Sequence, residues 1–442
     1  MNCLIFIPSQ KANTMHGTFL LYLCLLAAIL FLVMLAQQLK LSYPIMLVLG
    51  GLALSFIPRL PNIEINPELI FIIFLPPLLY EAAWQTSWKE FWKWRRVITS
   101  FAFIIVIVTS FVIAIISSHF IPGFTLALGF LLGGIISPPD AVAATSVLKG
   151  IQVPKRLISI VEGESLLNDA SSLIVFRFAL IAVDTGHFIF RDAAFSFGLV
   201  VIMGVVTGLA IALVFYAIHR WLPTTPNINV VLTFIAPYLM YIVAEQFHFS
   251  GVLAVVSGGL FLSHQNQRIF DHRTRFRNEN VWSAIGFALN GLVFMLIGLQ
   301  LPVIVQQLGS DGLRDGIKYG LLISGSLIIL RLLCTFGASV FTRVISHVIT
   351  TADPNPGWRG PILLGWAGMR GVVSLAAALS IPLKLDNGLP FPQRDLILFI
   401  TFTVILVTLV LQGLTLPLVV RWVNMKDPDY VMPMEEQEIH IR

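Results

Sequence analysis

The stretch GFLLGGIISPPDAVAATSV, residues 129–147, decides the fold, because it is a long apolar segment that cannot remain one helix. Pro139 has no backbone N–H and clashes with the preceding turn, so a helix has to open there. Gly133 and Gly134 weaken the segment further. Asp140 then falls at the start of a new half-helix. A charge at mid-bilayer costs roughly 2.5–3.5 kcal/mol on insertion scales, so this carboxylate is expected to face a partner or a water-filled cavity.

The composition of the whole chain agrees with a membrane location. Of its 442 residues, 57% are hydrophobic and 12% are charged, and the mean hydropathy is +0.87. A soluble domain carries about 25% charged residues. The composition therefore indicates a polytopic integral membrane protein of the all-α class, in contact with membrane lipid. The formal charge of +5 is explained by the membrane topology, and it indicates no nucleic-acid partner.

Thirteen segments are long enough to cross a bilayer as helices, since about 20 residues span the hydrocarbon core. They lie near residues 17–37, 42–58, 67–84, 97–117, 121–148, 156–182, 193–219, 229–247, 250–263, 281–305, 316–349, 359–382 and 394–422.

The lysines and arginines of the loops predict the orientation, because cytoplasmic loops are enriched in them. With the amino end outside, the cytoplasmic side receives the cluster Lys89, Lys93, Arg95 and Arg96 and the basic loop 268–277. We therefore expect a multi-pass protein of the plasma membrane with its carboxyl end in the cytoplasm.

A second interrupted segment lies at the corresponding place in the other half of the chain. It reads GWAGMRGVVSLAAALSIP, residues 365–382, with Gly368 and Gly371 on either side of Arg370. By the topology above, the two interrupted segments run in opposite directions. Two broken helices in inverted halves are the sequence mark of a secondary transporter's midplane site. The alternative is that these glycines only permit close helix packing.

The sixth segment contains VEGESLLNDASSLIVF, residues 161–176, which carries most of the polar chemistry. At about 100° per residue, its polar side chains fall on two adjacent stripes, Ser165–Asp169–Ser172 and Glu164–Asn168–Ser171. Oxygens of Asp169 and Ser165 suit a hard monovalent cation, and Asn168 donates to a carboxylate without adding charge.

The charges of this region predict an exchange of ions. Glu164 is expected to pair with Arg370, because a guanidinium matches a carboxylate bidentately and keeps its proton. Asp140 and Asp169 then remain. Two nearby acids in a medium of low dielectric constant cannot easily both be ionised, so the site requires either a metal cation or a proton. Competition between the two predicts antiport.

The residues quoted above resemble a known family, the cation:proton antiporters of the sodium/proton exchanger type, in their bacterial and archaeal branch. The resemblance covers nearly the whole chain. Its motifs are FLPPLLYEA (74–82), ISPPDAVAAT (136–145), EGESLLNDA (162–170), SGVLAVVSGGL (250–260), LVFMLIGLQLP (292–302) and GMRGVVSLAAALSIP (368–382).

The resemblance implies a role for particular residues. Asn168 and Asp169 match the family's Asn-Asp pair, with Asp169 as the shared carrier of cation and proton and Asn168 holding Asp140. Asp140 and Ser165 match further site residues, so that Na⁺ would be held by Asp169, Asp140 and Ser165.

Four more residues take their expected roles from the family. Glu164 and Arg370 match its structural ion pair. Many members have threonine before the aspartate of the broken span, where this chain has Pro139, which can offer its carbonyl but no hydroxyl. Glu81 matches an acid that assists the site in some relatives, or else it is an interfacial glutamate near Lys89.

The resemblance also implies domains and assembly. The expected units are scaffold and dimerisation helices at 1–95 and 226–308, a core transport bundle at 96–184 and 309–424, a linking span at 185–225 and a short cytoplasmic tail at 425–442. Members with Asn-Asp at this place are thought to exchange one cation for one proton. We therefore expect an electroneutral, homodimeric Na⁺/H⁺ antiporter without a cofactor.

Three alternatives stay open at this point. One is a K⁺/H⁺ (or Li⁺/H⁺) antiporter of the same fold. A second, from the enzymes, is an intramembrane aspartyl protease, but neither Asp140 nor Asp169 follows the Gly-x-Gly pattern common in that class. The third is a passive cation channel, a class that typically has a ring of repeated acidic residues or a filter of backbone carbonyls.

Overall fold

A computed structural model describes residues 10–56, 72–148, 151, 153–186, 190–347, 353 and 357–425. These residues form helices and connecting loops, with one isolated β-bridge between Lys384 and Pro390. The all-α class is confirmed. Apart from Met425, the expected tail lies outside the described residues, as does the start of the third predicted span.

The first half of the chain supplies the helices before and around the first break. They are α1 (Gln10–Leu39), α2 (Tyr43–Ser55), α4 (Leu75–Gln85), α5 (Trp88–Thr99), the π-helical segment η1 (Ser100–Ile105), α6 (Val106–Phe120), α7 (Leu126–Ile136), α8 (Ala141–Leu148) and α9 (Lys155–Thr185). Segments α5, η1 and α6 form one continuous helix of 33 residues.

The second half repeats this arrangement of long helices around a broken one. It contains α10 (Phe190–Trp221), α11 (Pro226–Gln246), α12 (Gly251–Ile269), α13 (His272–Ile345), α14 (Arg359–Trp366), α15 (Val372–Leu379), α16 (Arg394–Val407), the π-helical η2 (Thr408–Gln412) and α17 (Gly413–Val423). Helix α13 joins the tenth and eleventh predicted spans across a kink at Gly309, whose φ is 74°.

Each of the thirteen predicted spans contains helix within the described residues. Eight helical segments there are long and apolar enough to cross a membrane. The other five predicted spans correspond to shorter, less apolar or broken elements, namely α1, α2, α4, α12 and the pair α14–α15.

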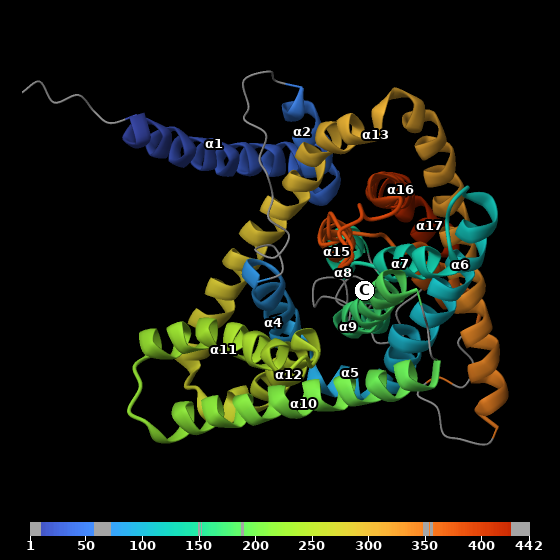
Figure 1. Cartoon of the computed structure of the whole chain (residues 1–442). Coiled ribbons are helices and arrows are strands. Elements are labelled where there is room, and N and C mark those ends of the chain that lie inside the picture. Colours follow the sequence, from blue (N-terminus) through green and yellow to red (C-terminus); the bar gives the residue numbers. More distant parts are fainter. Residues whose placement is uncertain are drawn as a thin grey trace, which may run out of the picture.

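The helices pack in two groups (Figure 1). In one group α12 contacts α4, α10 and α11. In the other, α7 contacts α6 and α9, and α16 contacts α15 and the second half of the chain's longest helix, α13. Helix α13 passes along both groups, its first half beside α4 and α11 and its second half beside α6.

The two broken helices meet at their breaks. Helix α7 ends at Ile136 and α8 begins at Ala141, while α14 ends at Trp366 and α15 begins at Val372. The backbone N–H of Asp140 in the first break donates to the carbonyl of Met369 in the second, at 2.7 Å. Backbone groups freed by each interruption are thereby satisfied away from water, as a buried backbone requires.

Helix α2 packs closely against the first half of α13, because a glycine in each helix lies against the backbone of the other. A Cβ on Gly298 would overlap the carbonyl oxygen of Val48, and one on Gly51 would overlap that of Met295. Small residues at such crossings let membrane helices approach closely. This contact places Tyr43, near the start of α2, beside the cavity described below.

This packing gives a stability prediction. Gly298→Ala should lower thermal stability, because overpacking costs about 1–3 kcal/mol. Gly325→Ala is the matched control in the same helix: nothing lies within 4 Å of its Cβ position, so the better helix propensity should leave stability unchanged or raise it by up to about 1 kcal/mol. The measurement is the fraction of monodisperse protein left after heating in detergent. Equal midpoints for both variants would contradict the close contact.

Candidate functional site

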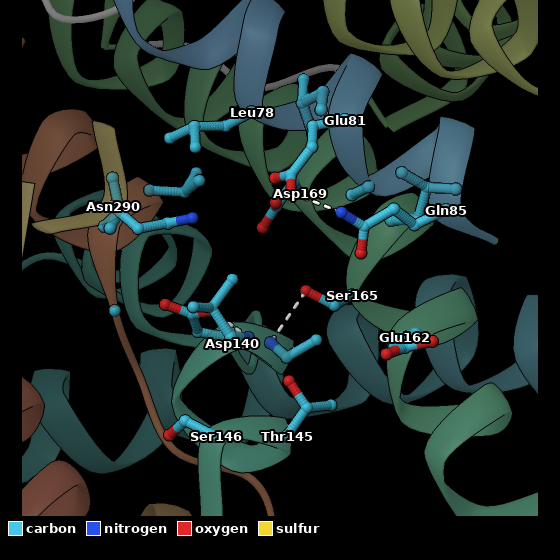
Figure 2. Close-up of a pocket in the computed structure, with 18 of the residues that line it drawn as sticks. Leu78, Glu81, Gln85, Asp140, Thr145, Ser146, Glu162, Ser165, Asp169 and Asn290 are labelled. Carbon is cyan, nitrogen blue, oxygen red and sulfur yellow. Dashed lines mark hydrogen bonds between the residues drawn. The ribbon is translucent and has the colours of Figure 1, made fainter. Parts of the chain in front are cut away.

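The residues singled out from the sequence gather around one cavity of about 310 Å³ (Figure 2). Four of its lining residues are acidic: Glu81, Asp140, Glu162 and Asp169. Uncharged polar lining comes from Tyr43, Gln85, Thr145, Ser146, Ser165, Ser283, Asn290 and Ser374. No basic side chain is among the described lining residues. The wall is therefore arranged to attract a cation.

The cavity is lined by both halves of the chain. Its lining residues come from the whole length of α4, from the first break and α8 (138–146), from the first half of α9 (162–169), from the first half of α13 (283–290) and from the start of α15 (371–374). Of the two basic segments that were predicted to be cytoplasmic, one follows α4 and the other lies at the start of α13.

Asp140 lies where the two broken helices cross. Its Oδ1 accepts a hydrogen bond from the backbone N–H of Val142 at 2.8 Å, and the N–H groups of Ala143 and Val372 are directed at the same carboxyl group. The carboxylate thus faces the amino-terminal ends of α8 and α15, where free N–H groups and the helix dipole stabilise an anion. Gly371 leaves the space for it, because a Cβ there would overlap the carboxylate.

Helix α9 holds the first break from both sides of Asp140. The hydroxyl of Ser165 accepts from the backbone N–H of Ala141 at 3.1 Å. The side-chain amide of Asn168 donates to the carbonyl of Pro139 at 3.2 Å. Asn168 was predicted to hold Asp140 itself. It instead holds the preceding carbonyl, because the Asp140 carboxyl already turns toward the backbone N–H groups of α8.

Asp169 comes from the middle of α9 and is 9% exposed. Its carboxyl group is directed into the cavity, and Glu81 reaches into the same space from α4 (Figure 2). Gln85, one turn after Glu81, donates to the Glu81 carboxylate at 2.6 Å. Of the two readings of Glu81, the structure supports a position in the cavity wall.

Glu164 forms a buried bidentate ion pair with Arg331 of α13. The Nη1–Oε1 distance is 2.5 Å and the Nη2–Oε2 distance is 2.6 Å, with side chains 4% and 1% exposed for Arg331 and Glu164. The guanidinium also lies 5.6 Å from the centre of the Phe101 ring. The partner expected from the sequence was Arg370; in the structure it is Arg331.

Arg370 serves the helix breaks instead. Its guanidinium donates to the carbonyls of Ile136 at 2.8 Å, Ser137 at 3.1 Å and Gly368. The physical reason is proximity: Arg370 lies within a break, where interrupted helices leave carbonyl oxygens without their usual partners. Arg331 could have been suspected from the sequence, because it is a second arginine inside a long apolar span.

A further ion pair lies toward the opposite end of α9. Arg177 contacts Glu245 at the end of α11, and Glu245 also accepts from the backbone N–H of Gly251 at 3.1 Å. This pair joins α9 to α11. The pair is partly exposed, with side chains 45% and 28% accessible.

Comparison with known proteins gives consistent similarities. The family model described as "Sodium/hydrogen exchanger, transmembrane" matches residues 25–422. A sodium, potassium, lithium and rubidium/H⁺ antiporter of Bacillus pumilus (strain SAFR-032) is 35% identical over 380 residues, which are 83% of this chain and 56% of the relative. The Na⁺/H⁺ antiporter ApNhaP of Aphanothece halophytica is 33% identical over 393 residues, 86% of this chain and 70% of the relative.

A solved structure has the same fold. The sodium proton antiporter MjNhaP1 from Methanocaldococcus jannaschii superposes with a TM-score of 0.73 at 17% identity, covering 93% of this chain and all of that one. The chain spans a little more than half the length of the Bacillus relatives that it matches.

The buried ion pair gives the prediction for this site. Glu164→Gln should destabilise the protein by about 3–5 kcal/mol, because it leaves the Arg331 charge buried without a partner. Glu245→Gln, the same change in the partly exposed pair, should cost about 0–1 kcal/mol. Thermal unfolding in detergent measures both. If Arg331→Met were harmless while Arg370→Met matched Glu164→Gln, the pairing described here would be wrong.

Proposed function

The chain belongs to the sodium/hydrogen exchanger family, and from this premise we propose that it is a secondary transporter that exchanges a monovalent cation for protons across the plasma membrane. We propose Na⁺ as the main cation, with Li⁺ and K⁺ as alternatives, and pH homeostasis as the setting. The observation that carries the proposal is the cavity in which Asp140, Asp169 and Glu81 meet with no basic lining residue described. Membership of a family of transporters favours exchange over the protease and the channel.

The chemistry of the cavity explains why the two ions would exchange. Carboxylates gathered in a site of low dielectric constant repel one another, so their negative charge has to be covered. Either a cation or a proton can do this, and occupation by one disfavours the other. Because a bare charge is costly to carry through a membrane interior, the site would move only when it is loaded. One cation then exchanges for one proton.

We assign the residues as follows. Asp169 is the shared carrier, since it comes from the unbroken helix α9 and faces the cavity. Asp140 and Ser165 complete the oxygen ligands of the cation, with Glu81 as an accessory acid. Asn168 and Pro139 are positioning residues, because their hydrogen bond fixes the backbone next to Asp140.

Alternating access would arise from movement between the two helix groups. We propose that residues 96–184 and 309–424 form the moving core, that 1–95 and 226–308 form a scaffold, and that 185–225 link them. In support, the cavity lies between α8 and α9 on one side and α4 and the start of α13 on the other.

The opposite end of the same boundary is crossed by the pair Arg177–Glu245. We propose that this pair closes the outer end while the cavity is open to the cytoplasm, with the amino end of the chain outside. A partly exposed ion pair is worth about 0–1 kcal/mol, which suits a contact that has to break in every cycle.

We also propose a homodimer. In support, α1 exposes several large apolar side chains, among them Leu30, Phe31 and Met34. A second scaffold or the lipid would cover this face.

The carrier role gives one prediction. Asp169→Asn removes the titrating oxygen, so Na⁺-driven proton movement in vesicles should fall to the level of empty vesicles. Asp184→Asn is the matched control: it is the same change on the same helix, outside the cavity, and it should leave exchange intact. Normal exchange by Asp169→Asn would refute the assignment.

The competition gives a second prediction. When the external and internal pH are lowered together, the apparent Michaelis constant for Na⁺ should rise, by up to about tenfold per pH unit, because protons occupy the carboxylate that Na⁺ needs. Initial rates at several Na⁺ concentrations and pH values measure it. A constant that does not change with pH would point to separate sites.

A further inference from the structure

A second and larger cavity, of about 640 Å³, lies apart from the exchange site. It is enclosed by α5 and η1, the start of α9, the end of α13 and α14. None of its lining residues lines the cavity around Asp169. The exchange mechanism proposed above assigns no role to this cavity.

The rim of this cavity carries an excess of positive charge. Its basic residues are Lys93, Arg95, Arg96 and Arg156, and its acidic residue is Asp353. Arg156 and Asp353 pair at 2.7 Å. Lys93, Arg95 and Arg96 come from one helix, α5, and lie within four positions of one another. Such a cluster attracts an anion, and guanidinium groups suit a phosphate in particular.

The rest of the lining is apolar and opens toward the lipid. It includes Phe101, Leu157, Ile160, Phe341 and Leu364. Phe341 is 64% exposed, so this wall of the cavity reaches the apolar outer surface of α13. An occupant would therefore have its charged part at the rim and its apolar part against a surface that faces hydrocarbon.

Tryptophans place the rim at the depth of the lipid headgroups. Arg95 lies 4.5 Å from the ring centre of Trp92, and Lys93 lies 5.6 Å from that of Trp94. Trp88 stacks on Trp92 at 5.6 Å. Tryptophan is enriched at the membrane–water interface, where its ring lies among the headgroups. Basic side chains at this depth meet lipid phosphates directly.

We propose that this cavity binds an anionic phospholipid, with its phosphate at Lys93, Arg96 and Arg156 and an acyl chain along Phe101 and Phe341. The charge excess at the rim favours a lipid with net negative charge over a zwitterionic one. The apolar wall favours a lipid over a free phosphate compound, which would contact the rim alone. Such a lipid would touch η1, α9, α13 and α14 of the proposed core, and Lys93 at the end of the proposed scaffold range. Phe101, over which Arg331 lies, would form part of its binding surface.

Native mass spectrometry of the purified chain in detergent tests the proposal. Phosphatidylglycerol and phosphatidylcholine with the same acyl chains are titrated separately, and glycerol phosphate is added as a competitor. We expect phosphatidylglycerol to bind about tenfold more tightly than phosphatidylcholine. Lys93→Gln combined with Arg96→Gln should weaken phosphatidylglycerol binding by about tenfold or more, given about fivefold for each basic residue near an anionic headgroup.

Two controls separate the cavity from general attraction. Lys89→Gln combined with Arg273→Gln removes the same charge from exposed positions outside the cavity and should leave binding within about twofold. Ala338→Phe fills the apolar part without changing charge and should weaken both lipids. The proposal is overturned by equal binding of the two lipids, by equal losses in the two charge pairs, or by displacement of lipid with equimolar glycerol phosphate.

Discussion

The hydrogen bond between the backbone of Asp140 and that of Met369 joins the two interruptions on which this structure depends. A helix that opens inside a membrane leaves N–H and C=O groups that no water can reach, and each is costly if it stays unpaired. Here the N–H of one interruption bonds to a carbonyl of the other. The side chains of Arg370, Ser165 and Asn168 satisfy further backbone groups. The polar groups at the crossing are therefore needed to stabilise the interrupted helices, in addition to any role in binding an ion.

Charges are divided between the cavity and the protein behind it. The carboxylates of Asp169 and Glu81 face the cavity. The buried arginines lie behind its wall, Arg331 on Glu164 and Arg370 on backbone carbonyls. Because those guanidinium groups are already engaged, the negative charge in the cavity is left for a mobile partner to cover.

The sequence was sufficient for features that local chemistry determines. Pro139 and Gly371 mark the breaks, and helical periodicity places Ser165 and Asp169 on one side of α9. The sequence was insufficient for contacts in which several side chains, far apart along the chain, compete for the same partner. Glu164 lies 167 positions from Arg331, and the packing of α13, not the residue types, decides which of two arginines reaches it. The target of Asn168 was off by one residue for a similar reason, since Pro139 and Asp140 both offer acceptors and backbone geometry selects between them.

Because Glu164 pairs with Arg331, substitutions outside the cavity lining are also expected to affect the site. Arg331 lies in the second half of α13, which contributes none of the described residues that line the cavity. Yet Glu164 directly precedes Ser165, whose hydroxyl holds the start of α8. A mutational screen restricted to the residues that line the cavity would therefore miss Arg331, whose ion pair with Glu164 helps to fix the turn of α9 that carries Ser165.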